Sequence, residues 1–157
     1  MKVNIVLADV GTQDSVGKLN LLGAGWSQTQ VGPNGRTPDM SIAIFVEIPW
    51  DRANREILLI AELIDEDGQA VTLPTSPDQA QPVRIEHRPV AGPPLGAPNG
   101  SPAQVSMLIN MQGGLPLQPG RWYSWRVSVD GEQREDWQAK FYVSRLGTAP
   151  TFGRPVG

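Results

Sequence analysis

Residues that break regular backbone structure are spread along the whole chain, and this constrains the fold more than any other feature of the sequence. Gly contributes 17 and Pro 15 of the 157 residues. Pro cannot continue a helix and Gly weakens one, so their spacing leaves little room for long helices. The length suits one domain, which at this size buries enough surface to fold without a disulfide or a metal.

Between these breakers, apolar residues recur at the period of a β-strand. The clearest run is 40–48, in which Ile42, Ile44, Val46 and Ile48 share one face. β-Branched residues at period two favour a strand over a helix. Further strands are expected at 2–8, 18–26, 55–65, 69–73, 82–90, 104–110, 122–129 and 137–144.

One of these runs is ambiguous. Residues 55–65 place Ile57, Ile60, Ala61 and Ile64 at helical spacing, and Asp51 is a possible helix cap. The run ends, however, in Asp-Glu-Asp-Gly before a second apolar run, and Asp-Gly between apolar runs is a strong hairpin signal. We therefore predict a strand, preceded by a short helical turn at 51–54.

Eight or nine short strands separated by turns predict an all-β fold, an antiparallel β-sandwich of immunoglobulin-like or C2-like architecture. Residues 1–146 would form the single domain and 147–157 an irregular tail. Pro119-Gly120 followed by Trp122 and Tyr123 resembles the tyrosine corner of immunoglobulin-like domains, in which either ring is a candidate for the corner hydrogen bond. No Cys pair accompanies it, so the resemblance is to the architecture alone.

Charge and hydropathy exclude several classes of protein. The formal net charge is −3, and the arginines are scattered rather than clustered, which argues against binding to nucleic acid. The N-terminus lacks the apolar core of a signal peptide, and no apolar run reaches the roughly 18 residues of a membrane span. Synthesis without export is therefore expected.

The residues for catalysis and metal binding are sparse. With one His and no Cys, most zinc sites and all thiol nucleophiles are excluded, and no Gly-x-Ser-x-Gly elbow is present. We predict neither an enzyme nor a cofactor, and we interpret His87 as structural or solvated. The acidic run at 65–67 could bind Ca²⁺ only if Asp51 or Asp130 joined it, and a solvated turn is favoured instead.

The five Trp residues are expected to divide between the core and the surface. Trp125 alternates with apolar residues and is predicted to be buried. Trp122 and Trp137 flank the Asp130-Gly131 turn and are predicted to form a cross-strand pair. Trp26 and Trp50 are the candidates for interface anchors. Next to Trp50, an arginine among residues 51–55 is expected to pair with a carboxylate.

Four sequence blocks, in order, resemble those of a small uncharacterised family of actinobacteria and their bacteriophages. They are residues 17–26, 48–55, the Asp65–Gly68 turn and the Leu-x-Pro-Gly-Arg segment that ends at Arg121. The family has no assigned activity, so the resemblance implies no catalytic residue. It does imply a virion or another phage-encoded component, so the expected location is a virion, or the cytoplasm if the protein is not encoded by a phage.

Together these features favour a non-catalytic protein that acts through protein–protein contacts, most concretely a structural or decoration protein of a virion. Partners would be capsid or tail proteins or further copies of the chain, contacted through the loop 91–102 and the tail 148–157. The candidate interface residues, besides Trp26 and Trp50, are Pro93, Pro94, Pro98, Phe152 and Arg154. The alternative is a carbohydrate- or ligand-binding module that uses Trp26, Trp50 or Trp122.

Overall fold

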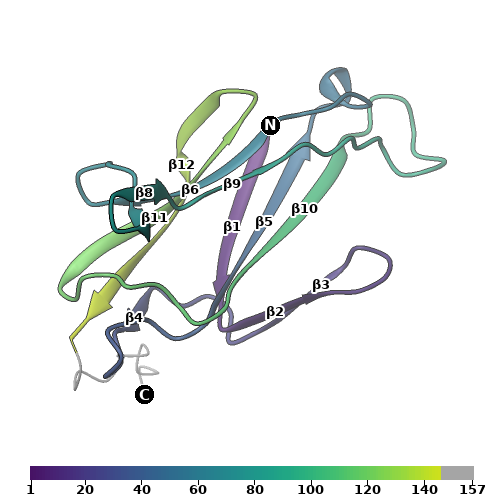
Figure 1. Cartoon of the computed structure of the whole chain (residues 1–157). Helices are drawn as coiled ribbons and strands as arrows, with labels where there is room; N and C mark the ends of the chain where they lie inside the picture. Colours follow the sequence, from purple (N-terminus) through teal and green to yellow (C-terminus); the bar gives the residue numbers. More distant parts are fainter. Residues whose placement is uncertain (146–157) are drawn as a thin grey trace, which may run out of the picture.

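A computed structural model describes residues 1–145, and within them the structure is all-β (Figure 1). The first of its sheets has three antiparallel strands, in the order β1 (Lys2–Ala8), β5 (Met40–Ile48) and β10 (Ala103–Met111). The bounds of β1 and β5 are those expected from the alternating apolar residues. The prediction of an all-β chain is therefore confirmed.

The second main sheet has five strands. Their order is β4 (Gln28–Gln30), β12 (Glu132–Ser144), β11 (Arg121–Val129), β6 (Leu59–Asp65) and β9 (Arg84–His87). β4 pairs with β12 in parallel, whereas the other neighbours are antiparallel. The ambiguous run 55–65 is thus a strand in its second half, and the helical alternative is wrong.

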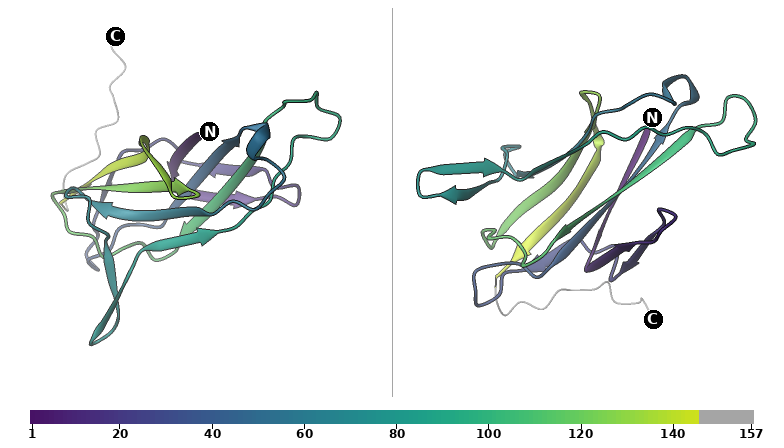
Figure 2. Two further views of the ribbon diagram at one scale, coloured as in Figure 1. Left: turned by 90° about the horizontal axis from the view of Figure 1, so that it is seen from above. Right: turned by 45° about the vertical axis from the view of Figure 1, so that its right-hand side comes forward.

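Two hairpins project from these sheets (Figure 2). One consists of β2 (Val10–Gln13) and β3 (Leu19–Leu22), and the other of β7 (Thr72–Ser76) and β8 (Gln79–Pro82). β3 and β7 overlap expected strands, whereas β8 shares only Pro82 with one and β2 shares none. The polar residues of β2 and β8 show no apolar alternation.

The inward faces of the two main sheets contribute to one hydrophobic core. From β5 it receives Ile42, Ile44, Val46 and Ile48, as their period predicts, and from β11 the fully buried Trp125. Phe141 of β12 is also fully buried and packs edge-on against Trp26. Burial of Trp125 is therefore confirmed. No helix in the described part of the chain is long and apolar enough to cross a membrane.

The turn before β11 forms a tyrosine corner. The hydroxyl of buried Tyr123 accepts a hydrogen bond from the backbone N–H of Gln118 at 3.0 Å, and its ring stacks on Phe141. Of the two candidate rings, Tyr123 therefore makes the corner, while Trp122 is half-exposed. The side chain of Tyr123, on β11, thus fixes the turn that precedes β11.

The predicted pairing of Trp122 with Trp137 is wrong. The register at the turn, Val129↔Glu132, would by itself place Trp122 opposite Ala139, and a bulge shifts its partner further, to Tyr142. From Ser128↔Gln133 to Arg126↔Gln138, the chain advances two residues along β11 but five along β12. The extra residues contain Trp137, which is buried instead of pairing across the strands.

Two local predictions around β6 need correction. A helical turn is present before it, η1 (Trp50–Arg52), but its cap residue is Pro49 and no side chain caps it, so Asp51 does not act as a cap. The Asp65–Gly68 turn is present, with the Gly68 N–H donating to the Asp65 carbonyl at 3.0 Å. Beyond one bridge to β6, however, the following chain turns away to form β7 and β8.

Gly114, between β10 and β11, lies against a neighbouring segment. It is buried at a φ of +64°, and a Cβ built on it would fall 2.6 Å from the carbonyl carbon of Thr37, with the carbonyl oxygen closer still. Thr37 also exchanges two hydrogen bonds with Leu115, one from its backbone N–H and one to its hydroxyl, both of 2.9 Å. The guanidinium of Arg36 binds the carbonyls of Gly113 and Gly114 at 2.8 and 2.9 Å. Only glycine suits both this conformation and this contact.

Candidate functional site

Two segments far apart in the sequence meet at one end of the molecule. The backbone N–H of Asn54 donates to the carbonyl of Ala91 at 2.9 Å, and Ala103 pairs with Ile48 at the end of β5. The first residue of the loop 91–102 is thus held next to Asn54, after η1, and the residue that follows the loop is held next to Ile48, before η1. The proline-rich loop and η1, which begins at Trp50, project at the same end of the molecule in Figure 1.

This end exposes large apolar side chains. Trp50 is 63% and Val90 66% exposed, and Leu95 is fully exposed. Together with the exposed Pro94, we call these residues the apolar tip. Single exposed apolar residues are common on protein surfaces, but grouped ones are typical of contact surfaces.

Hydrogen bonds within the loop give it a defined shape. The N–H of Ala97 donates to the Pro94 carbonyl at 3.0 Å, and the N–H of Ser101 donates to the Pro98 carbonyl at 3.1 Å. The hydroxyl of Ser101 reaches the same carbonyl at 2.7 Å. The loop thus consists of two successive turns rather than a strand, which agrees with its Gly and Pro content.

An ionic network anchors the base of the apolar tip to the hairpin between β11 and β12. Arg52 reaches Asp130 at 3.4 Å and Glu132 at 3.1 Å, and Arg55 reaches Asp130 at 3.2 Å. The other oxygen of Asp130 accepts the backbone N–H of Leu58 at 2.8 Å. The expected pairing of an arginine from 51–55 with a carboxylate is confirmed.

Hydrogen bonds from Arg134 and then from Arg52 hold the pKa of the Glu132 carboxyl below its ordinary value. Arg134 also lies over the ring of the buried Trp137, 5.0 Å from its centroid. Glu132 is therefore ionised throughout the neutral range, and the network remains intact there.

The predicted interface residues separate into three groups. The first group is Trp50 of η1 and Pro93, Pro94 and Pro98 of the loop 91–102, which lie at the end of the molecule that carries the apolar tip. Trp26 is half-buried, with its ring centroid 5.7 Å from that of Phe141, just before β4, which lies at the other end of the molecule (Figure 1). Phe152, Arg154 and the proposed contact tail lie outside the described residues.

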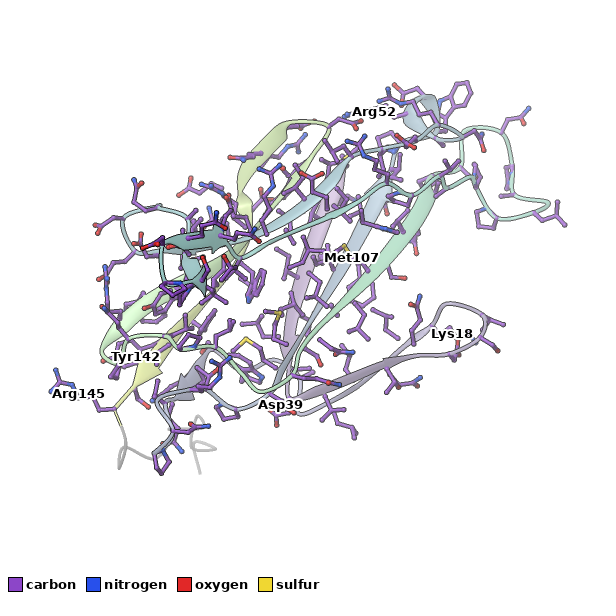
Figure 3. The ribbon with its side chains drawn as sticks, in the orientation of Figure 1. Lys18, Asp39, Arg52, Met107, Tyr142 and Arg145 are labelled. Carbon is purple, nitrogen blue, oxygen red and sulfur yellow. The ribbon has the colours of Figure 1, made fainter. Side chains whose placement is uncertain are left out.

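Trp122, the candidate for ligand binding, is on a different surface. It is 49% exposed on the outer face of the five-stranded sheet, and its ring centroid is 5.4 Å from that of Tyr142. Figure 3 labels Tyr142 and Arg52, which lie toward opposite ends of the molecule. The Trp122 surface is therefore separate from the apolar tip.

The acidic turn is occupied by hydrogen bonds and an arginine. Arg121 reaches Glu66 at 2.9 Å and Asp67 at 3.6 Å, and the bond to Glu66 raises the pKa of Arg121. Asp65 accepts the backbone N–H groups of Asp67 and Gln69. Within residues 1–145, no group of three or more His, Asp or Glu side chains is placed to hold a metal ion. His87 is exposed on β9.

Sequence reasoning missed Val90 and Leu95. Val90 stands at the end of an expected strand, where an apolar residue suggests the core. Leu95 did carry a signal, because a lone leucine between Gly and Pro residues has no strand or helix period to direct it inward. Tyr142 was missed as the partner of Trp122 because the bulge in β12 cannot be read from the spacing of the residues.

Most of the chain matches the model of a protein family. A model described as a family of unknown function (DUF6941) matches residues 4–144. This agrees with the predicted resemblance to an uncharacterised family. No curated protein matches the chain.

Proposed function

Since the chain belongs to the DUF6941 family of unknown function, its role has to be inferred from its own residues, and we propose that it is a non-catalytic protein that acts through protein–protein contacts. The apolar tip is the contact surface. The observation that carries this proposal is the grouping of Trp50, Val90 and Leu95, all exposed, at one end of the molecule.

The construction of the tip supports this proposal. Trp residues are enriched among the few interface positions that carry most of the binding energy. The turns within the loop and its prolines restrict the free conformations, so less entropy is lost on docking. The pairs from Arg52 and Arg55 to Asp130 hold η1 in place before a partner arrives.

The finer architecture that we propose is an immunoglobulin-like β-sandwich formed by residues 1–146, followed by the tail 147–157. Two features support it: one core shared by the two main sheets, and the tyrosine corner made by Tyr123. In this arrangement the tip lies at one end of the sandwich, where the connecting loops gather.

The most concrete form of the proposal is a structural or decoration protein of a virion, whose partners are capsid or tail proteins or further copies of the chain. The sequence blocks that resemble a phage-associated family support this form. The tail 148–157 would be a second contact segment, and deleting it should prevent assembly without unfolding the monomer. Unchanged assembly would exclude the tail from the contact.

The tip is tested by site-specific photo-crosslinking in the native host or particle. A crosslinking amino acid replaces Leu95 in one protein and Gln81 in another. Gln81 is exposed on β8, in the hairpin that projects on the other side of the molecule (Figure 2). We expect an adduct of one defined mass from position 95 and none from position 81.

Competition provides the control. Unlabelled wild-type protein should suppress the adduct, whereas a Trp50→Ala competitor should not. Trp50 is mainly exposed, so this substitution should change the free energy of unfolding by no more than about 0.5 kcal/mol. Equal adducts from both positions, or full competition by Trp50→Ala, would refute the role of the tip.

A further inference from the structure

A groove lies on the outer face of the five-stranded sheet, away from the apolar tip. Its volume is about 560 Å³, within the range of roughly 300–1,000 Å³ typical of small-molecule sites. It crosses β6, β11 and β12 beside the acidic turn. The groove is lined by Ile64, Asp65, Glu66, Gly68, Trp122, Ser124, Arg126, Gln138 and Lys140.

Trp122 gives the groove a fixed aromatic surface. Its ring contacts that of Tyr142, directly opposite on β12, with an angle of 50° between the planes. Because Trp122 is still 49% exposed, part of the indole is available to a ligand. The electron-rich face of an indole attracts polarised C–H bonds, such as those on the apolar face of a sugar ring.

Polar side chains stand in cross-strand rows next to this ring. Ser124 lies opposite Lys140, and Arg126 lies opposite Gln138. On its other side Arg126 faces Glu62 of β6 and binds it through Nη2 at 2.8 Å. The Nε of Arg126 is buried and has no hydrogen-bond partner. The Arg126 side chain is nevertheless 26% exposed, so other atoms of it are accessible to a ligand in the groove.

The charges of the lining residues select the class of ligand. Asp65 and Glu66 are balanced by Arg126 and Lys140, so the nine lining residues carry no net charge. A phosphate, a nucleic acid or a polyanion needs a positive field, which this groove does not provide. A neutral ligand with many hydroxyls matches both the aromatic face and the alternating donors and acceptors.

We propose that this groove binds a neutral saccharide. The indole of Trp122 stacks on one sugar ring, while Gln138, Lys140 and Arg126 form hydrogen bonds with its hydroxyl groups. This site does not depend on the proposed role of the apolar tip, so each of the two proposals can be refuted without affecting the other.

The test is affinity electrophoresis of the full chain through gels that contain one soluble neutral polysaccharide each: a β-glucan, an α-glucan, a galactomannan and an arabinoxylan. Heparin serves as the anionic comparison. We expect retardation by at least one neutral polysaccharide and none by heparin. Trp122→Ala should raise the dissociation constant at least tenfold, and Gln138→Ala should raise it to a smaller extent.

Two further variants separate binding from folding. Trp122→Phe retains an aromatic face and contact with Tyr142, so its binding should lie between wild type and Trp122→Ala. Phe45→Ala removes an exposed aromatic side chain of β5, outside both the groove and the apolar tip, and should bind as wild type. The proposal is overturned if no neutral polysaccharide retards the wild type, if heparin retards it equally, or if Trp122→Ala binds as wild type. If no adduct forms from position 95 but a neutral polysaccharide still retards the wild type, only the proposed role of the apolar tip is rejected.

Discussion

Gly113 and Gly114 provide a matched pair of substitutions, because both have positive φ and only one has a close neighbour. Their φ values are +77° and +64°. A Cβ on Gly113 meets nothing within 4 Å, whereas on Gly114 it falls 2.6 Å from the carbonyl carbon of Thr37 and 2.9 Å from the carbonyl oxygen of Pro38. The pair therefore separates the cost of the backbone conformation from that of the steric clash.

Alanine in the left-handed region costs about 1–2 kcal/mol, partly offset by the lower entropy of the unfolded chain. Gly113→Ala should therefore reduce the free energy of unfolding by about 1 kcal/mol. Gly114→Ala must also displace backbone. Relief of the clash would disturb the two hydrogen bonds between Thr37 and Leu115, each of which contributes about 0.5–1.5 kcal/mol. It would also move the buried Leu115 side chain, whose burial contributes about 1.5–3 kcal/mol.

We therefore expect Gly114→Ala to lose at least about 3 kcal/mol of stability, or to fail to accumulate as folded protein. Urea unfolding followed by tryptophan fluorescence measures both variants, since Trp125 and Trp137 are buried in the native state. If Gly114→Ala lost no more stability than Gly113→Ala, the close approach of Gly114 to Thr37 would not exist in solution.

Two further predictions concern the corner and the ionic network. Tyr123→Phe removes the acceptor of the Gln118 N–H and should lower the free energy of unfolding in urea by about 1–2 kcal/mol. Tyr142→Phe, the control, should lower it by less than about 0.5 kcal/mol. Equal effects of the two substitutions would contradict the hydrogen bond at the corner. The folded pKa of Glu132 is lowered by Arg134, so its carboxylate stabilises the fold above the ordinary glutamate pKa and that stability is lost as the pH falls through the lower folded value. Glu132→Gln should therefore lower the melting temperature at pH 7 and flatten its decline between about pH 5 and 2, whereas an unchanged slope would exclude this contribution.

The strands predicted with correct bounds are those in which burial alone determines the sequence pattern. β1 places Val3 and Leu7 on the core, and β5 places Ile42, Ile44, Val46 and Ile48 there at a period of two, so both strands carry a period that can be recognised. β2 and β8 pair mainly through their backbones and carry polar residues, as in Thr12 and Gln81, so no period marks them. Backbone pairing without burial leaves little trace in a sequence.

The errors at the candidate sites also have physical causes. The turn at Asp130-Gly131 was predicted, but the extra residues of the β12 bulge cannot be located from the turn. They bury Trp137 and place Tyr142 beside Trp122. The tip was found in part, since Trp50 and the prolines share it. That η1 and the loop would meet depends on the pairing of β5 with β10, which joins residues far apart in the chain.

The anchoring of the loop 91–102 at its two ends means that its length can change without a change in the sheets. Its ends are held by the backbone at Asn54 and Ile48, whatever side chains lie between them. Doubling the length of such a loop costs only about 0.6 kcal/mol of closure entropy. Insertions between the two turns of the loop, away from Ala91 and Gly92, should therefore leave the core intact. The same position is suited to displaying a grafted peptide.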